Sequence, residues 1–194
     1  MSEARRYRRK GLDSTSREIV ELLKRHGIEG RSVLEVGGGI GGIQLELLKA
    51  GAARATSVEL TPTYEEAAGG LLREAGLEDR VQRQVSDFVL SGITVPEADV
   101  LVMNRVICCY PDMPRLAAAA ADHTREILVL SFPRATWWTR LAVTVGNFVL
   151  RAARREFQVF VHPPRSIVAT LEGHGLSAVL NHAGAFWTVA AFSR

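Results

Sequence analysis

The chain has 194 residues, of which 47% are hydrophobic and 23% are charged, and its formal net charge is +3. These values are typical of one soluble globular domain over residues 1–194. A domain of this size buries about 70% of its unfolded surface and needs no cross-links to stabilise its core. Cys108 and Cys109 are neighbours in sequence, which argues against a disulfide-rich secreted framework and offers no metal-ligand spacing. We therefore expect a cytoplasmic protein with no metal site.

The start of the chain is strongly basic, with Arg5, Arg6, Arg8, Arg9 and Lys10 close together. We expect a solvated, flexible terminus over residues 1–13, and specific phosphate binding is the alternative. No apolar h-region follows these residues, so we expect no signal peptide. No run of 18 apolar residues occurs, so we expect no membrane-spanning helix.

The hydrophobic pattern alternates between helical and strand periods along the chain. Ser14 or Thr15 could cap the first helix, and Gly27 could end it. In chain order we expect helix 14–26, strand 32–36, helix 41–50, strand 54–60, helix 62–75, strand 81–85, strand 99–103, helix 111–123, strand 127–132, helix 135–155 with a possible break at Gly146, helix 163–172, and strands 176–182 and 186–192.

Repeated strand–helix units predict a Rossmann-like, doubly wound α/β fold with a mainly parallel seven-stranded sheet. The last two strands are joined by a connection too short for a crossover, so they must form an antiparallel C-terminal hairpin. This hairpin distinguishes the chain from ordinary dinucleotide-binding folds.

The strongest local signal is the glycine-rich segment over residues 33–42, Val-Leu-Glu-Val-Gly-Gly-Gly-Ile-Gly-Gly. Glycines allow φ > 0 and close approach of a ligand, and the following helix supplies free N–H groups. Gly37, Gly39 and Gly42 fit a dinucleotide pattern. Glu59, about 20 residues further on, is where an acid holds ribose hydroxyls. These features do not separate a dinucleotide from other cofactors that contain a ribose.

Glu35 does separate them. A carboxylate about 4 Å from a pyrophosphate is repelled by roughly 4 kcal/mol per unit charge at an effective dielectric constant of about 20. A ligand that carries an ammonium and a sulfonium, as S-adenosylmethionine does, would instead be stabilised. The alternative is that Glu35 only accepts backbone N–H bonds within the loop.

Together these motifs resemble the class I S-adenosylmethionine-dependent methyltransferases, from residue 32 to the C-terminus. The family's acid-x-Gly-x-Gly-x-Gly motif is matched by Glu35, Gly37, Gly39 and Gly41. Its later motifs are matched by Glu59, by Asp87 and by strand residues 98–104. Gly38 departs from the family, because many members have Cys or Ala there.

The resemblance implies that the three glycines hold the methionine portion of S-adenosylmethionine and that Glu59 accepts from the ribose hydroxyls. It also implies that Leu60 packs against adenine, that Asp87 and Phe88 border the base, and that Asn104 lies where the sheet meets both ligands. Asp87 could instead cap the next segment, and Phe88 could belong to the core.

The acceptor side resembles magnesium-protoporphyrin methyltransferases and related small-molecule enzymes, through residues 104–112 and 130–134. The insertion over residues 134–165 could be a lid over an apolar acceptor or an interfacial helix that contacts a membrane peripherally. A core-packing helix and a dimer contact are the alternatives, and the oligomeric state stays open. His162 and Tyr110 are the candidate catalytic residues, His162 as a general base, although both could be structural.

We therefore predict a methyltransferase that acts on a small, apolar or aromatic molecule by direct displacement at the methyl group. RNA or protein methylation is the alternative, and an NAD-binding oxidoreductase is a third reading. Nucleic acid is not the expected partner, because the fourth strand lacks the Asn/Asp-Pro-Pro-aromatic signature of amino-group base methylases.

Overall fold

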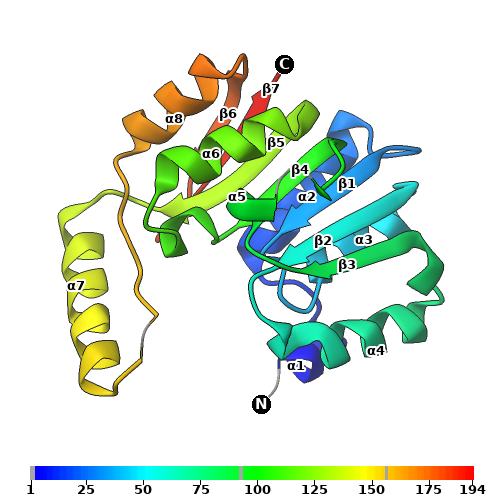
Figure 1. Ribbon diagram of the computed structural model, residues 1–194, viewed down its shortest axis with the longest axis horizontal. Coiled ribbons are helices and arrows are strands. Elements are labelled where there is room, and N and C mark those ends of the chain that lie inside the picture. The colour runs from blue at the N-terminus through cyan, green and yellow to red at the C-terminus, as the bar shows by residue number, and fades with distance from the viewer. Residues whose placement is uncertain (1–2, 92–93, 156) are drawn as a thin grey trace.

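One seven-stranded sheet, in the order β3-β2-β1-β4-β5-β7-β6, forms the centre of the molecule (Figure 1). The computed structural model describes residues 3–91, 94–155 and 157–194. The strands are β1 Ser32–Val36, β2 Arg54–Glu59, β3 Val81–Val85, β4 Ala98–Asn104, β5 Thr124–Pro133, β6 Ser177–Ala183 and β7 Trp187–Ser193. Strands β1 to β5 pair in parallel, whereas β7 pairs antiparallel with both β5 and β6. The predicted fold, including the hairpin, is confirmed.

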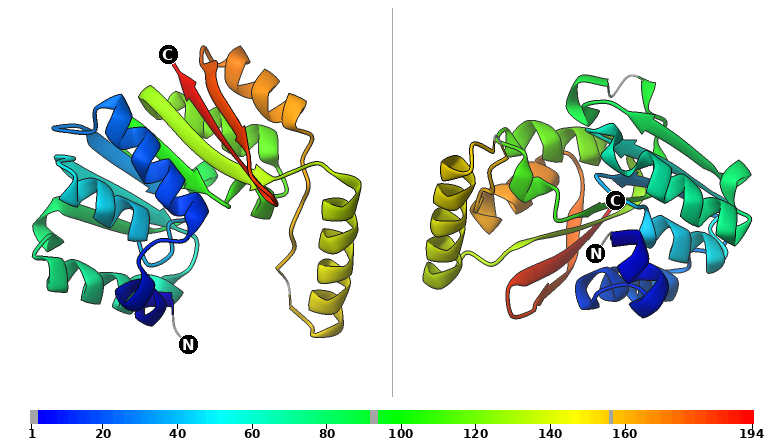
Figure 2. Two further views of the ribbon diagram at one scale, coloured as in Figure 1. Left: turned by 180° about the vertical axis from the view of Figure 1, so that it is seen from behind. Right: turned by 90° about the horizontal axis from the view of Figure 1, so that it is seen from below.

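Helices cover both faces of this sheet (Figure 2). The helices are α1 Glu3–Lys10, α2 Ser14–His26, α3 Gly42–Lys49, α4 Glu65–Ala75, α5 Phe88–Ser91, α6 Met113–Asp122, α7 Trp137–Ala152 and α8 Pro164–Gly173, with short 3-10 turns at Pro62–Tyr64, Glu78–Arg80 and Ile107–Cys109. Helices α2 and α3 pack on one face of the sheet, and α6 and α8 pack on the other.

The strands alternate side chains between these two layers, as the period of a strand requires. In β4, Leu101 and Met103 join the core under α6 and α8, while Val100 and Val102 join the core under α2 and α3. Burial on both faces explains why β4 and β5 read as continuous apolar runs in the sequence. The sheet is therefore a rigid platform whose carboxyl edge carries the loops.

The N-terminal segment corrects the expectation of a flexible terminus, because residues 3–10 form α1. Ala4 is buried, the Tyr7 hydroxyl donates to Glu46 of α3, and Arg8 forms a 2.6 Å ion pair with Glu74 of α4. One of the basic residues that suggested a frayed terminus, Arg8, thus helps to hold this helix in place.

Helices α2 and α7 each differ in one feature from the sequence expectation. The cap of α2 is Asp13, not Ser14 or Thr15, because the Asp13 carboxylate accepts from the N–H groups of Thr15 and Ser16. The C-terminal cap at Gly27 is confirmed, with φ 96°. Helix α7 continues without a break through Gly146. In the part of the chain that the structure describes, no helix is long and apolar enough to cross a bilayer.

Candidate functional site

The glycine loop follows β1 at the carboxyl edge of the sheet. Gly37, Gly39 and Gly41 adopt φ of 65°, 61° and 72°, a left-handed conformation that side chains disfavour. A Cβ added at Gly37 would lie 2.5 Å from Cγ2 of Val106, so that position also lacks room. The loop borders a cavity of about 320 Å³, which Gly37 and Gly39 line and Gly41 does not. Gly41 is instead the N-cap residue of α3.

Glu35 lies beneath this loop and is only 1% exposed. Its Oε2 accepts from the backbone N–H of Gln44 at 3.3 Å, and the residue also lines the cavity. Glu35 therefore accepts a backbone N–H from the first turn of α3, rather than from the loop itself, and also lines the cavity. Burial raises the pKa of Glu35 to about 7, and the charge of Glu59 adds to that rise.

Glu35 also explains the unusual Gly38. A Cβ added at Gly38 would lie 2.6 Å from Oε2 of Glu35, closer than real Cβ atoms approach. The buried carboxylate thus takes the space that a side chain at position 38 would need. Glycine at position 38 therefore leaves the room that the Glu35 side chain occupies.

Glu59 ends β2 on the other side of the loop and is largely buried. Its carboxylate accepts from the N–H of Gly39, and burial raises its pKa. Both predicted acids therefore line the same cavity. Their local positions follow from the parallel pairing of β1 with β2, which brings the carboxyl ends of the two strands together.

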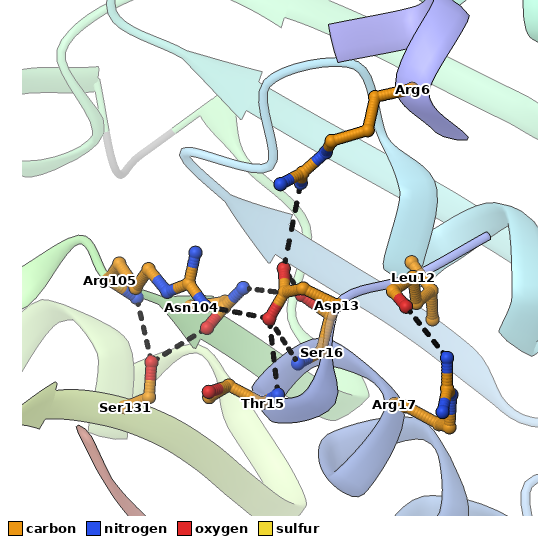
Figure 3. A network of polar contacts seen from close by, with 9 residues as sticks. All are labelled: Arg6, Leu12, Asp13, Thr15, Ser16, Arg17, Asn104, Arg105 and Ser131. Atoms are coloured by element: carbon orange, nitrogen blue, oxygen red, sulfur yellow. Dashed lines mark hydrogen bonds and ion pairs between the residues drawn. The ribbon is translucent and has the colours of Figure 1, made fainter. Parts of the chain in front are cut away.

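The roof of the cavity comes from the N-terminal segment, which the sequence analysis did not assign to the site. Arg6, Tyr7, Leu12, Asp13 and Ser16 line it from α1, the following turn and α2. Figure 3 shows Asp13 between Arg6 and Arg105. The Arg105 Nη2 donates to Asp13 at 2.7 Å, and Arg6 approaches the same carboxylate at 3.9 Å.

Asn104 and Arg105 form the facing wall, at the end of β4. Ser131 Oγ donates to Asn104 Oδ1 at 2.7 Å, and Asn104 Nδ2 donates to Ser16 Oγ at 3.0 Å (Figure 3). Arg105 has φ 63°, and its N–H donates to Ser131 Oγ at 2.9 Å. Its guanidinium lies over the ring of Trp187, 5.0 Å from the centroid. Its buried Nε has no hydrogen-bond acceptor among the described residues.

A second cavity of about 390 Å³ adjoins the first and shares Gly37, Glu59, Tyr64 and Arg105 with it. Most of its other lining residues are apolar: Val36, Val58, Leu60, Phe88, Val106, Leu116 and Phe157. The predicted adenine residues Leu60, Asp87 and Phe88 all line this cavity.

These three residues differ in their surroundings. Leu60 is 64% exposed, whereas Phe88 is buried in the core. Asp87 accepts from the N–H of Val89 at 2.9 Å, so it does cap α5, and it also accepts from the Tyr110 hydroxyl at 3.2 Å. Asp87 thus caps α5 and Phe88 packs in the core, as the sequence alternatives stated, and both residues also line the second cavity.

The two candidate catalytic residues, Tyr110 and His162, lie next to each other, but only Tyr110 lines a cavity. Tyr110 lines the second cavity, and burial raises its pKa. His162 lies 3.1 Å through Nε2 from the carbonyl oxygen of Tyr110, so this nitrogen carries the proton and donates. Its ring stacks on Phe160. His162 lines neither of the two cavities, so its role as a base stays a prediction.

Within the described ranges, no group of three His, Cys, Asp or Glu side chains is placed to hold a metal ion. Cys109 lines the second cavity, while Cys108 is buried beside it. Cofactor binding would therefore depend on the glycine loop, the two glutamates and the wall formed by Asn104 and Arg105.

No protein-family model and no curated sequence matches this chain. Among solved structures, the chain is similar to magnesium protoporphyrin IX methyltransferase of Synechocystis PCC 6803 with bound SAH. The identity is 16%, the TM-score is 0.76, and the match covers 93% of this chain and 82% of that one. An O-methyltransferase family protein of Burkholderia thailandensis matches with 18% identity and a TM-score of 0.74, over 93% of this chain and 56% of that one.

A third similar structure, the [4+2]-cyclase SpnF, has 11% identity and a TM-score of 0.70, over 91% of this chain and 80% of that one. Identities this low establish a common fold and leave the reaction open. The chain has the fold of S-adenosylmethionine-dependent methyltransferases, which the cyclase shares.

Proposed function

We propose that this chain binds S-adenosylmethionine and transfers its methyl group to a small, apolar or aromatic molecule. The observation that carries the proposal is the pair of buried glutamates, Glu35 and Glu59, on either side of a glycine loop within one cavity. Carboxylates in that position stabilise a cationic ligand and destabilise a phosphorylated one.

The charges around the first cavity support the same choice. Four carboxylates and two guanidiniums line it: Glu3, Asp13, Glu35, Glu59, Arg6 and Arg105. The acids suit an ammonium, a sulfonium and ribose hydroxyls, while the unpaired Nε of Arg105 suits a carboxylate. An amino acid with a sulfonium and a ribose has all of these groups, whereas a dinucleotide would bring two phosphates to an acidic lining.

In this proposal the first cavity holds the methionine and ribose portions, beside Gly37, Gly39, Glu59, Asn104 and Arg105. The second cavity holds adenine against Leu60 and Phe88, with Asp87 at the base edge. When bound, S-adenosylmethionine would supply a sulfonium methyl group to a nucleophile of the acceptor, with S-adenosylhomocysteine as the leaving group. The contribution of the chain is alignment of the two reactants, which can supply about 7–11 kcal/mol of the barrier.

The apolar lining near Tyr110 and Phe157 supports a small apolar or aromatic acceptor. The similar Synechocystis protein is named for such a molecule, magnesium protoporphyrin IX. If the acceptor atom carries a proton, His162 is our candidate base through Nδ1, because its Nε2 donates to Tyr110. Tyr110 would orient the acceptor.

Calorimetric titration with S-adenosylmethionine, S-adenosylhomocysteine, NAD and ATP tests the cofactor. We expect saturable binding of the first two and none of the phosphorylated pair. Binding of NAD with no response to S-adenosylmethionine would overturn the proposal and favour an oxidoreductase.

Radiolabelled methyl transfer tests the reaction, using aromatic small molecules, bulk RNA and an unmodified protein mixture as acceptors. We expect label only in the first class. Label in RNA or protein would keep methyl transfer and refute the small acceptor. Cofactor binding without any transfer would leave the cofactor assignment intact and refute the reaction.

A further inference from the structure

Helix α7 stands beside the sheet rather than on it (Figures 1 and 2). Thr139 is its one buried side chain among the described residues. Asn147 attaches the helix to the segment that returns to α8, because its Nδ2 donates to the Val159 carbonyl at 2.7 Å and its Oδ1 accepts from the Val159 N–H at 2.9 Å. Neither cavity is lined by a residue of α7. The helix is thus not a lid over the site in this arrangement.

The side of α7 that faces away from Asn147 is apolar and exposed. At about 100° per residue, its six large exposed side chains fall within a stripe about 120° wide. These side chains, with their exposed fractions, are Trp137 77%, Phe148 73%, Val149 58%, Leu141 56%, Val145 54% and Trp138 39%. We call this set the α7 face. A contiguous patch of aromatic and aliphatic side chains on a soluble surface marks a binding surface.

The charges around the α7 face have one sign. Residues 127–155 contain no Asp or Glu but five arginines, Arg134, Arg140, Arg151, Arg154 and Arg155. Arg140 and Arg151 lie about three helical turns apart along one border of the apolar stripe, and Arg154 and Arg155 follow the end of the helix. An anionic surface complements this border over the full length of the helix.

We infer that the α7 face docks on a bilayer that contains anionic phospholipids, with the helix lying in the plane of the interface. An amphipathic helix with aromatic anchors on one side and arginines at its border is the pattern of an interfacial helix. A second copy of the chain is a poorer occupant, because two such faces packed together would bring arginine borders together with no acid in either segment. This inference does not depend on methyl transfer.

The position of α7 gives docking a consequence for the site. The helix begins just beyond the end of β5, at the same edge of the sheet as the glycine loop. Phe157, which follows the helix, is 53% exposed and lines the second cavity. Phe157 therefore connects the segment that follows the docked helix to the lining of the second cavity.

Vesicle flotation tests the inference, with phosphatidylcholine vesicles and with vesicles of phosphatidylcholine and phosphatidylglycerol at a ratio of about three to one. We expect the wild-type chain to partition at least tenfold more strongly onto the anionic vesicles in 0.1 M salt, and to lose most of this preference in 0.5 M salt. The tryptophan fluorescence of the chain, to which the exposed Trp137 contributes, should shift to shorter wavelength on binding.

Two sets of variants separate the apolar and the charged contributions. Leu141→Ser with Phe148→Ser should lower partitioning at least tenfold, while Leu90→Ser, which changes a residue 72% exposed on α5, should not. Replacing Arg151, Arg154 and Arg155 by Gln should lower binding about a hundredfold, since each arginine near an anionic surface contributes about a fivefold factor. The control replaces Arg25, Arg54 and Arg73 by Gln.

Absence of wild-type binding to anionic vesicles, or an equal loss in the control variants, would overturn the inference. A wild-type dimer that Phe148→Ser converts to a monomer would assign the α7 face to contact between copies and also overturn it. If the double variant fails to fold, as judged by circular dichroism, the arginine variant carries the test. Cofactor titration of the same variants keeps this outcome separate from the proposed function.

Discussion

Replacing Glu35 by Gln should stabilise the folded chain at neutral and alkaline pH. Glu35 is 1% exposed, and its pKa is raised from 4.5 to about 7 by burial. One pKa unit corresponds to about 1.4 kcal/mol, so the ionised carboxylate costs the folded state roughly 3 kcal/mol at pH 8. The Gln amide can still accept from the N–H of Gln44 while it avoids this cost.

The pH dependence follows from the direction of that shift. Between about pH 4.5 and 7 the folded chain holds a proton on Glu35 that the unfolded chain has lost. The stability that this group contributes is therefore full below pH 4.5 and is lost as the pH rises through 7. The difference in unfolding free energy between the Gln variant and the wild type should grow from near zero at pH 4.5 to roughly 3 kcal/mol at pH 8.

Urea denaturation at pH 5, 6, 7 and 8 measures this difference. Using the difference cancels the contributions of titrating groups that do not interact with Glu35, such as Asp13 and Asp99, whose pKa values are lowered. Parallel pH profiles for the two proteins would refute the reasoning, because they would mean that Glu35 titrates alike in both states.

The same variant should bind S-adenosylmethionine more weakly, since it lacks the charge that a cationic ligand favours. If only the ionised form of Glu35 binds, wild-type affinity should rise about tenfold from pH 6 to pH 8, because a group with a pKa of about 7 is largely protonated at pH 6. Affinity of the Gln variant should be nearly independent of pH over this range. Calorimetry at three pH values would measure both, and a wild-type affinity that falls with rising pH would contradict this explanation.

Three more variants test the rest of the site. Glu59→Ala should weaken cofactor binding by about 1–3 kcal/mol, because ribose hydroxyls lose a charged acceptor; an unchanged dissociation constant would remove Glu59 from the site. Gly38→Ala should lower the unfolding free energy by about 1–3 kcal/mol, since the new methyl group overlaps Glu35. Its control in urea titrations is Gly146→Ala, where the added Cβ meets open space and no loss is expected. His162→Ala should lower turnover while the cofactor dissociation constant stays nearly the same, and full activity in that variant would exclude a role as base.

Elements whose signals are local were predictable from the sequence. Helix α2 ends after His26 because Gly27 can adopt φ 96°, and the sequence shows that glycine directly. The short connection between β6 and β7 required the antiparallel hairpin. Glu35 and Glu59 could be brought to one edge because parallel strands share the direction of their carboxyl ends.

Features that depend on distant contacts were not predictable. Asp13, Ser14 and Thr15 are all good capping residues, and Asp13 also binds Arg105, which is 92 positions further along the chain. The left-handed φ of Arg105 has no sequence signature, since residues other than glycine adopt it only when their surroundings hold them there. Helix α1 reads as a charged tail because its anchors lie on α3 and α4.

Helix α1 and the turn that follows it cover part of the first cavity. The occupancy of this cavity is therefore linked to the mobility of α1. A molecule that fills this cavity is partly enclosed by residues 3–16, so separation of this segment from α3 and α4 would speed its release. Hydrogen exchange at the amides of α1 becomes a direct reporter of how often the site is filled.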